Sequence, residues 1–370
     1  MNIFSYIGSI PRKLVARGLV KSGYSAHYAA AFFDIWYEDI FKNKTTSLNK
    51  KVWAHRRGFF SRRIKNYGLT EDNYKDYLTD FDYLRLHPIN GPYSRWIDDK
   101  LTIKYLLYPF SEYLPDYYYH ICSGEILRLM DCPDGFEATI PDILALLKAK
   151  GCLAAKLISG ARGQGFHKLA YIGHDFFINH QLSSQENVSE LITMWQNNKN
   201  MEYILTEYIS AHSTLEKISG DTPGTVRIVV IRGKDRHPEI VFSFIKFATK
   251  KSGASNAAAS MICLVDENTG YFDDGITLKG DSVLDCKFHP DTNILLEGVL
   301  PNWSLIKEKI ILICDHIPQV IYMGFDLIIT DGGFKIIEIN SHSGIFSFQY
   351  FHPVYKTEWS REFFSRFLSR

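Results

Sequence analysis

Gly324-Phe-Asp-Leu-Ile-Ile-Thr-Asp-Gly-Gly-Phe-Lys-Ile-Ile-Glu-Ile-Asn340 contains two apolar runs separated by Asp331-Gly332-Gly333. Such runs around a glycine-rich turn predict a β-hairpin. Residues two apart on a strand share a face, so Glu338 and Asn340 project together, and Asp326 can lie opposite them. Oxygen-bearing side chains on one rigid face suit Mg²⁺, which takes substrate phosphates as further ligands. The alternative, a polar set on a surface hairpin, is less favoured because carboxylates are rarely buried unless paired or metal-bound.

Composition indicates a folded protein with an uneven charge distribution. The chain has 370 residues, of which 46% are hydrophobic and 22% charged, with a net charge of +1. This is enough apolar material for two or three structural units and argues against disorder. Residues 41–70 hold nine Lys and Arg and no Asp or Glu. That stretch predicts either contact with an anionic partner or an ordinary solvated helix face.

The cysteines and the N-terminus bear on the cellular location. The six cysteines are scattered without a Cys-x-x-Cys pair, so they predict neither a zinc site nor a disulfide framework. No apolar run reaches the roughly 18 residues of a membrane span, and the N-terminal charges follow a short apolar stretch, unlike a signal peptide. We expect a cytoplasmic protein. Residues 11–21 could form an amphipathic helix on the inner face of a membrane, or pack on their own domain.

The pattern of hydrophobic residues changes along the chain. Residues 1–83 are expected to be helical, with helices over 26–41 and 48–66. From about residue 117 short strands are expected to alternate with single helices, which indicates an α+β or α/β fold rather than a helical bundle. The predicted strands are 117–121, 152–158, 167–172, 203–209, 225–232 and 239–249, and the predicted helices among them are 98–107, 140–150, 188–197 and 303–317.

A glycine-rich loop follows the predicted strand 152–158. Its sequence is Ser159-Gly-Ala-Arg-Gly-Gln-Gly-Phe166, it comes shortly after Lys156, and another strand follows it. Glycines let the backbone approach a phosphate and present N–H donors, and the lysine supplies a matching charge. The spacing is not that of a P-loop, and no helix follows as in a dinucleotide-binding loop. The loop is therefore either a hairpin covering phosphates or an ordinary hairpin loop.

Two other predicted strands carry polar groups in apolar surroundings. The strand 203–209 ends in Glu207-Tyr208-Ile209. Its backbone could bind an adenine edge; alternatively, it is a plain core strand. Arg227 lies within an apolar strand and needs an anionic partner, either a structural carboxylate or a transferring phosphoryl group. Lys246 lies within the next predicted strand, which is also apolar, and it likewise needs an anionic partner.

The order of these features resembles the ATP-grasp superfamily. Asp99-Lys100 before a predicted helix and Asn340-Ser-His-Ser343-Gly344 after the hairpin resemble further motifs of that superfamily, with Ser343 where proline is usual. A narrower resemblance, over roughly residues 84–350, is to its sugar-transfer-associated, teichuronopeptide-type branch. The segments that carry it are Thr225-Val-Arg227, Asn256, Asp266-Glu-Asn-Thr-Gly270, His289-Pro-Asp-Thr292 and Gly298-Val-Leu-Pro-Asn-Trp303.

This resemblance implies a fold, cofactors and roles for individual residues. The fold is α+β, with two ATP-grasp subdomains over 84–212 and 213–370 that sandwich the nucleotide, preceded by a helical, basic region over 1–83. The implied cofactors are ATP and Mg²⁺. The implied roles are phosphate binding by Lys100 and Lys156, a lid of Gly160, Gly163 and Gly165, an adenine and ribose end lined by Glu207, Tyr208 and Ile209, a metal set of Asp326, Glu338 and Asn340, and a catalytic set of Arg227, Lys246 and Gly344.

The chemistry implied by the resemblance is ADP-forming ligation, in which a carboxylate attacks the γ-phosphate and an amine displaces the acyl phosphate. We therefore expect a ligase that joins an amino acid or amine to a carboxylate such as a uronic acid, in polysaccharide, cell-envelope or secondary-metabolite biosynthesis. Two alternatives stay open: a kinase acting on a sugar or small molecule, and a catalytically inactive nucleotide-binding scaffold. Residues 41–70 would contact an anionic polymer or a membrane surface, and no nucleic acid partner is expected.

Overall fold

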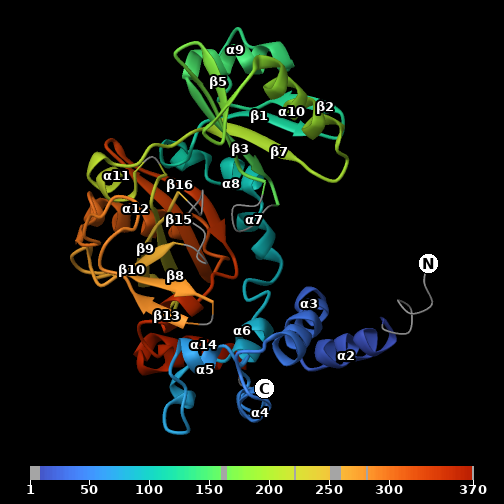
Figure 1. Cartoon of the computed structure of the whole chain (residues 1–370), viewed down its shortest axis with the longest axis vertical. Helices are drawn as coiled ribbons and strands as arrows, with labels where there is room; N and C mark the ends of the chain where they lie inside the picture. Colours follow the sequence, from blue (N-terminus) through green and yellow to red (C-terminus); the bar gives the residue numbers. More distant parts are fainter. Residues whose placement is uncertain (1–8, 160–164, 221, 251–259, 281, 369–370) are drawn as a thin grey trace.

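The computed structural model describes residues 9–159, 165–220, 222–250, 260–280 and 282–368. Two β-sheets and a group of helices make up this part of the chain (Figure 1). The first sheet takes its strands from residues 117–207 and the second from residues 225–340. Antiparallel sheets combined with helices confirm the predicted α+β class. No helix in these ranges is long and apolar enough to cross a lipid bilayer.

The first sheet contains seven strands within the described residues, in the order β2-β1-β7-β3-β4-β5-β6. Helices α9 (Ile140–Lys150) and α10 (Gln185–Asn197) cover one face, where Leu147 and Ile192 are fully buried in the same cluster as Leu153. The strands are β1 (Tyr117–Cys122), β2 (Glu125–Arg128), β3 (Cys152–Leu157), β4 (His167–Ile172), β5 (Asp175–Ile178), β6 (Gln181–Ser183) and β7 (Tyr203–Glu207).

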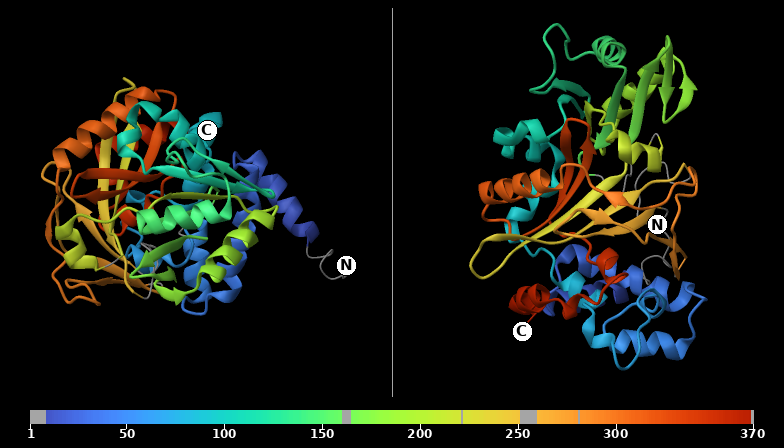
Figure 2. Two further views of the ribbon diagram at one scale, coloured as in Figure 1. Left: turned by 90° about the horizontal axis from the view of Figure 1, so that it is seen from above. Right: turned by 90° about the vertical axis from the view of Figure 1, so that its left-hand side faces the viewer.

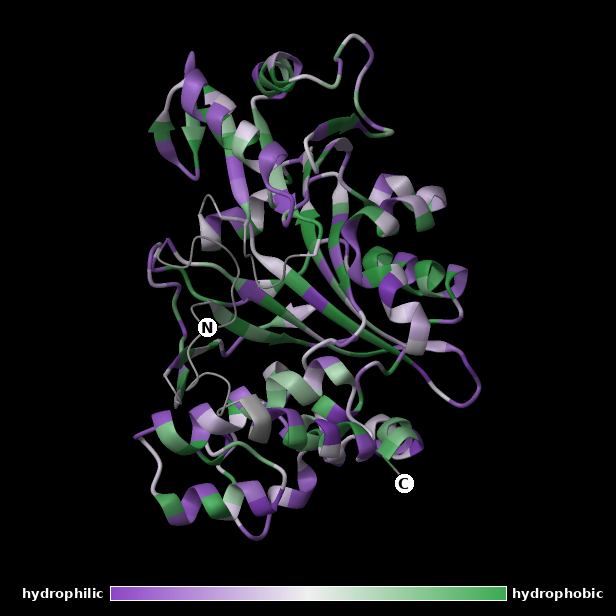
Figure 3. Ribbon diagram, turned by 90° about the vertical axis from the view of Figure 1, so that its right-hand side faces the viewer, coloured by the Kyte–Doolittle hydropathy of each residue, from purple (hydrophilic) through white to green (hydrophobic). Residues whose placement is uncertain are grey.

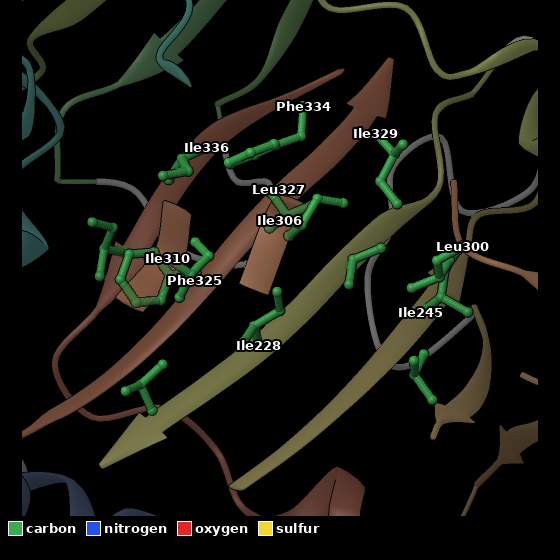
Figure 4. Packing of buried hydrophobic residues seen from close by; sticks show 14 of the residues in the cluster. Ile228, Ile245, Leu300, Ile306, Ile310, Phe325, Leu327, Ile329, Phe334 and Ile336 are labelled. Atoms are coloured by element: carbon green, nitrogen blue, oxygen red, sulfur yellow. The ribbon is translucent and has the colours of Figure 1, made fainter. Parts of the chain in front are cut away.

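The second sheet has the order β13-β12-β10-β9-β8-β15-β16, with β11 and β14 attached beside β10, for the residues that the structure describes. Helix α12 (Trp303–His316) covers one face, and Figure 4 shows Ile306 and Ile310 meeting Phe325 and Leu327 of β15. Burying each such side chain stabilises the fold by roughly 1.5–3 kcal/mol. The strands are β8 (Thr225–Arg232), β9 (Pro238–Phe247), β10 (Met261–Val265), β11 (Tyr271–Phe272), β12 (Ile276–Lys279), β13 (Ser282–Asp285), β14 (Gly298–Val299), β15 (Tyr322–Thr330) and β16 (Gly333–Asn340).

Helices from both ends of the chain gather against part of the opposite face of the second sheet (Figures 1 and 2). Tyr24, Phe60 and Leu84 from the N-terminal region share a buried cluster with Val229 of β8 and with Phe363 near the C-terminus. The helices are α2 (Ser9–Lys21), α3 (Ala26–Tyr37), the π-helix η1 (Glu38–Lys42), α4 (Leu48–Arg56), α5 (Arg63–Asn66), η2 (Tyr74–Asp76) and α6 (Asp80–Arg85), and then α13 (Phe346–Gln349), η5 (Val354–Lys356) and α14 (Glu358–Leu368).

One prediction about secondary structure is wrong, and several short strands were not predicted. The single helix expected over 48–66 is wrong, because α4 and α5 are separated by Gly58, whose φ is +82°. A Cβ at Gly58 would lie 2.9 Å from Thr79 Oγ1, so the chain turns where only glycine fits. Strands β2, β5, β6 and β10 to β14 were not predicted, because runs of two to five residues are too short to show a period.

The basic stretch 41–70 is not a uniform solvated face. Lys51 is buried and donates hydrogen bonds to the backbone oxygens of Ile40 and Asn43. Arg63 is buried against Asp80, which accepts from its Nε at 3.0 Å and from its Nη2 at 2.9 Å. The other members that are exposed are Lys42, Lys44, Lys50, Arg56, Arg62 and Lys65. Contact of this stretch with an anionic polymer or a membrane stays a prediction.

Short helices connect the N-terminal region to the sheets. They are η3 (Gly91–Tyr93), α7 (Ser94–Asp98), α8 (Lys100–Leu106) and η4 (Tyr108–Tyr113), and α11 (Ser213–Ser219) links the sheets. Helix α8 begins where Asp99 Oδ1 accepts a hydrogen bond from Thr102 N at 2.7 Å, which places Lys100 in its first turn. The predicted boundaries at residues 83 and 212 stay predictions.

Candidate functional site

One cavity of about 1680 Å³ contains most of the predicted site residues. Its wall takes side chains from β3, β4 and β7 of the first sheet and from β8, β9, β15 and β16 of the second. The predicted residues in this wall are Lys100, Lys156, Glu207, Tyr208, Ile209, Arg227, Lys246, Asp326, Glu338, Asn340 and Gly344. The predicted residues Gly160, Gly163 and Asn256 lie outside the described part of the chain.

Gly165, the third glycine of the predicted lid, does not belong to the cavity wall. Its φ is +69°, and a Cβ there would lie 2.5 Å from Leu157 Cδ1 and 3.1 Å from the hydroxyl oxygen of Tyr203. Close packing against the first sheet is therefore sufficient to require glycine at this position. Its role in a lid stays a prediction.

The alternation of side chains along β8 and β15 decides what faces the cavity. Val226 and Ile228 are fully buried in the cluster under α12, so Arg227 between them points to the opposite face. Asp326 likewise lies between two residues buried in that cluster. In Figure 3, short hydrophilic segments interrupt the otherwise hydrophobic strands of the second sheet. Arg227, Lys246 and Asp326 are polar residues of these strands.

A β-bulge at Ile337 brings Glu338 to the cavity. Ile336 points into the core, and regular alternation would send Glu338 to the same side. The register with β15 shifts between Asp326 and Leu327, so that Asp326 pairs with Glu338 and Ile337 is the extra residue. Both Ile337 and Glu338 consequently line the cavity. The predicted hairpin is confirmed, with Asp326 directly opposite Glu338.

Three polar side chains surround the carboxylate of Asp326. Arg227 donates from Nε to Oδ1 at 2.6 Å and from Nη2 to Oδ2 at 2.5 Å. Lys246 Nζ lies 4.0 Å from Oδ1, and Asn340 Nδ2 lies 3.4 Å from Oδ2. Burial would raise the pKa of Asp326, but Arg227 and Lys246 hold this pKa below its usual range. Asp326 is therefore ionised at neutral pH.

Arg227 also positions the loop that follows β16. Its Nη1 donates to Ser343 Oγ at 2.7 Å, and Ser343 is seated against Gly324, where a Cβ would lie 2.1 Å from that oxygen. A Cβ on the next residue, Gly344, would meet nothing within 4 Å, so the backbone there is accessible from the cavity. The roles of Arg227 toward a phosphoryl group and of Gly344 as a donor stay predictions.

Basic side chains that are buried or partly buried lie around Glu338. Lys100 Nζ lies 3.6 Å from Glu338 Oε1, yet burial raises the pKa of Glu338 despite this attraction. Burial, together with repulsion by Lys100, lowers the pKa of Lys156 to about 8. Burial also lowers the pKa of Lys246. Because burial destabilises these positive charges, a bound anion would stabilise them, and the cavity is suited to phosphate groups.

One part of the cavity wall, which we call the Glu207 end, is formed by Glu207, Tyr208 and Ile209. Glu207 Oε2 accepts a hydrogen bond from Asp116 N at 3.2 Å and lies 4.0 Å from Lys335 Nζ. The ammonium group of Lys168 lies 4.3 Å from the ring centroid of Tyr208. This end therefore combines an aromatic ring, a carboxylate and backbone groups at the end of a strand.

Sequence reasoning missed Lys168, which also lines the cavity. It pairs with Ala154 across the β3–β4 hairpin, two residues from Lys156 on the same face of β3. The available signal was its position just after the glycine-rich loop, because a hairpin brings the two strands beside that loop together. The structure thus adds a basic side chain to the pair Lys100 and Lys156.

The donor set of Asp326, Glu338 and Asn340 fits a magnesium ion that is shared with phosphates. Two carboxylates and an amide oxygen are hard oxygen ligands, and all three side chains line one cavity. Within the described ranges, no three His, Cys, Asp or Glu side chains gather as a metal-binding group. These residues therefore suit Mg²⁺ held partly by substrate oxygens better than an ion enclosed by protein alone.

Comparison with known proteins gives a family match and distant structural likenesses. No curated protein matches the chain significantly. D-alanine–D-alanine ligase from Bacillus anthracis, complexed with ATP, is 14% identical with a TM-score of 0.35, covering 68% of this chain and 57% of that one. D-alanyl-alanine synthetase A from Vibrio cholerae is 8% identical with a TM-score of 0.43, covering 74% and 65%. Biotin carboxylase from Campylobacter jejuni is 13% identical with a TM-score of 0.38, covering 73% and 46%.

The chain therefore spans less than two thirds of the length of each of these structures. The family model of sugar-transfer associated ATP-grasp proteins matches residues 91–352, which is more than half of the chain and includes every predicted site residue. The protein belongs to the sugar-transfer associated ATP-grasp family.

Proposed function

We propose that this protein is an ATP-dependent, ADP-forming carboxylate–amine ligase. The observation that carries the proposal is the meeting of Lys100, Lys156 and Lys246 with Asp326 and Glu338 in one cavity between the two sheets. Such a site neutralises phosphate charge on one side and offers oxygen ligands to a cation on the other. Family membership supports the same proposal.

ATP would bind with its phosphates between the basic side chains of the two sheets. Lys156 and Lys168 extend from the first sheet, and Lys100 from the start of α8. The base and ribose would lie at the end formed by Glu207, Tyr208 and Ile209, where backbone groups at the end of a strand can bind the adenine edge. Asp326, Glu338 and Asn340 would hold Mg²⁺, which when bound neutralises the negative charge of the β- and γ-phosphates.

The reaction would proceed by two transfers. A substrate carboxylate oxygen attacks the γ-phosphorus, forming an acyl phosphate while the bond to ADP breaks. The amine nitrogen then attacks the acyl carbon, forming the C–N bond, and inorganic phosphate leaves while the nitrogen loses its proton. Phosphoryl transfer depends on positioning and on stabilisation of charge more than on a protein nucleophile. Arg227 holds Asp326 and Ser343 in place, and the backbone at Gly344 is open. Together they would supply the positioning and the stabilisation of charge.

The proposed substrates are a uronic acid or related sugar carboxylate and an amino acid or other amine. The family description, sugar-transfer associated, supports a sugar on the carboxylate side.

We also propose a helical region over 1–83 and two ATP-grasp subdomains over 84–212 and 213–370. The exposed part of the basic stretch 41–70 would contact an anionic polymer or the inner face of a membrane.

The test is ADP release from Mg·ATP in a screen of uronic acids combined with amino acids, each also supplied alone. A ligase requires both substrates for sustained turnover, and the product contains a new amide bond detectable by mass spectrometry. Turnover with a sugar and no amine, giving a phosphorylated sugar, would indicate the kinase alternative. ATP binding without turnover on any pair would favour the inactive scaffold.

A further inference from the structure

We propose that the N-terminal helical region forms the outer part of the active site and binds an anionic sugar there, an inference that rests on the proposed ligase function. The cavity continues past Gly344 into a part that we call the helical pocket, lined by Tyr28, Arg62, Asn66, Tyr83, His87 and Tyr350. Most of these residues lie before residue 91, outside the family match. The helical region would then determine which carboxylate substrate this chain accepts.

The helical pocket is joined directly to the loop after β16. Tyr83 donates from its hydroxyl to the backbone oxygen of His342 at 2.9 Å, and their rings stack with centroids 4.1 Å apart. His342 Nε2 lies 2.9 Å from the backbone oxygen of Tyr83, which can only accept, so Nε2 carries the proton. Nδ1 then accepts from the hydroxyl of Tyr28, 3.1 Å away. The pocket is thus fixed relative to Gly344, two residues after His342.

The cavity is large enough for more than one ligand. Sites for a single small molecule are usually about 300–1,000 Å³, and this cavity measures about 1680 Å³. A nucleotide between the two sheets would leave the helical pocket for a second ligand of comparable size. A substrate that reacts beside Gly344 would extend into that pocket.

The helical pocket contains polar groups that can bind an anion. Arg63 is neutralised by buried Asp80, which also accepts from Phe60 N at 3.0 Å, and this network fixes the start of α5. Arg62, the residue before it, is exposed and lines the cavity. Asn66, four residues later, lies on the same side of the helical turn. A guanidinium and an amide on one side can bind a carboxylate and hydroxyl groups together.

Aromatic side chains supply the remaining surface of the pocket. Tyr28, Tyr83, Phe346 and Tyr350 line it. His342 stacks on one face of Tyr83, and Arg63 lies over the ring of Phe346. Aromatic rings in a cavity wall can lie against the C–H face of a sugar ring. The hydroxyls of Tyr28 and Tyr83 donate to His342, and their oxygens can still accept from sugar hydroxyls. The aromatic rings, the amide and the guanidinium together fit a saccharide with more than one uronic acid residue. Its reacting carboxylate would lie at Gly344 and a second carboxylate at Arg62.

The experiment measures binding of trigalacturonate to the full-length protein by calorimetry in the presence of Mg·ADP. Arg62→Gln should weaken trigalacturonate binding by about tenfold, because it removes one charge-assisted contact. Lys65→Gln, an exposed lysine of the same helix that is not in the cavity wall, is the matched control and should bind like the wild type. Mg·ADP affinity should be equal in all three proteins. Asn66→Ala provides a second variant if Arg62→Gln unfolds at a lower temperature than the wild type.

The outcomes separate this inference from the proposed function. Wild-type affinity for trigalacturonate in both Arg62→Gln and Asn66→Ala would overturn the inference, as would equal binding of neutral maltotriose. Binding of Mg·ADP without any binding of trigalacturonate would also overturn it, while leaving the nucleotide site intact. Absence of Mg·ADP binding would overturn the proposed function, whether or not trigalacturonate binds.

Discussion

Arg227 of β8 and Asp326 of β15 are directly paired across the second sheet and joined by two hydrogen bonds of 2.6 and 2.5 Å. Their side chains are only 13% and 11% exposed. A buried guanidinium and a buried carboxylate each depend on the other, because neither can be left without an opposite charge. The residue proposed to hold Mg²⁺ is therefore also part of the framework of the sheet.

The first prediction concerns this pair. Asp326→Ala should lower the free energy of unfolding by about 3–5 kcal/mol, because Arg227 would remain buried without its partner. The double variant Arg227→Met/Asp326→Leu should lose markedly less than the sum of its single variants, since both charges are removed together. Urea unfolding followed by circular dichroism measures both effects. Additive losses would show that the two side chains are not coupled.

The second prediction uses Glu338 to test the metal role without disturbing the pair. Glu338→Gln should reduce Mg²⁺-dependent ADP release by about 100-fold or more, because it removes an oxygen charge next to the phosphates. Its stability should stay near that of the wild type, since burial already raises the pKa of Glu338 and disfavours its charged form. Glu308→Gln, an exposed substitution on α12, is the control. Full activity of Glu338→Gln would contradict the metal assignment.

The third prediction is a pH dependence of nucleotide binding. Burial and repulsion by Lys100 lower the pKa of Lys156 to about 8, so its charge is present below pH 8 and lost above it. Phosphates bind the charged form, so Mg·ADP affinity should fall above pH 8 by up to about tenfold per pH unit. Calorimetry between pH 6.5 and 10 measures this. Lys156→Arg, which stays charged, should remove the inflection, and an unchanged profile in that variant would assign the inflection elsewhere.

The fourth prediction concerns stability and lies away from the cavity. Glu267 follows β10, its Oε2 accepts from Ser243 Oγ at 3.3 Å, and its buried Oε1 has no hydrogen-bond partner among the described residues. Burial raises its pKa from 4.5 to about 7, so the folded protein holds this proton more tightly than the unfolded chain. The contribution of Glu267 to the free energy of unfolding is thus fully present below pH 4.5 and is lost as the pH rises through 7. Glu267→Gln should flatten that decrease in urea unfolding measured from pH 5 to 8.5, and an equal slope in the variant would refute the assignment.

Much of the fold followed from local patterns. The helix over 140–150 was predicted with its observed bounds, with Pro141 in its first turn as the signal. In the structure Thr139 Oγ1 accepts from Asp142 N at its start, and Gly151 ends it with φ +75°. The hairpin of β15 and β16 was predicted from two apolar runs and a glycine-rich turn. These signals are local, so the sequence shows them directly.

The sequence by itself therefore determined the family, the hairpin and the residue types that line the cavity, because each of these rests on neighbouring residues or on the order of short motifs. Only the tertiary structure decided how they face one another. The bulge at Ile337 turns Glu338 to the cavity against the regular alternation of the strand, and Arg227 takes Asp326 as its partner although 99 residues separate them. The helical pocket likewise arises only where residues before position 91 pack against the loop after β16. Register shifts and contacts between distant segments depend on how whole elements pack, and no local pattern encodes them.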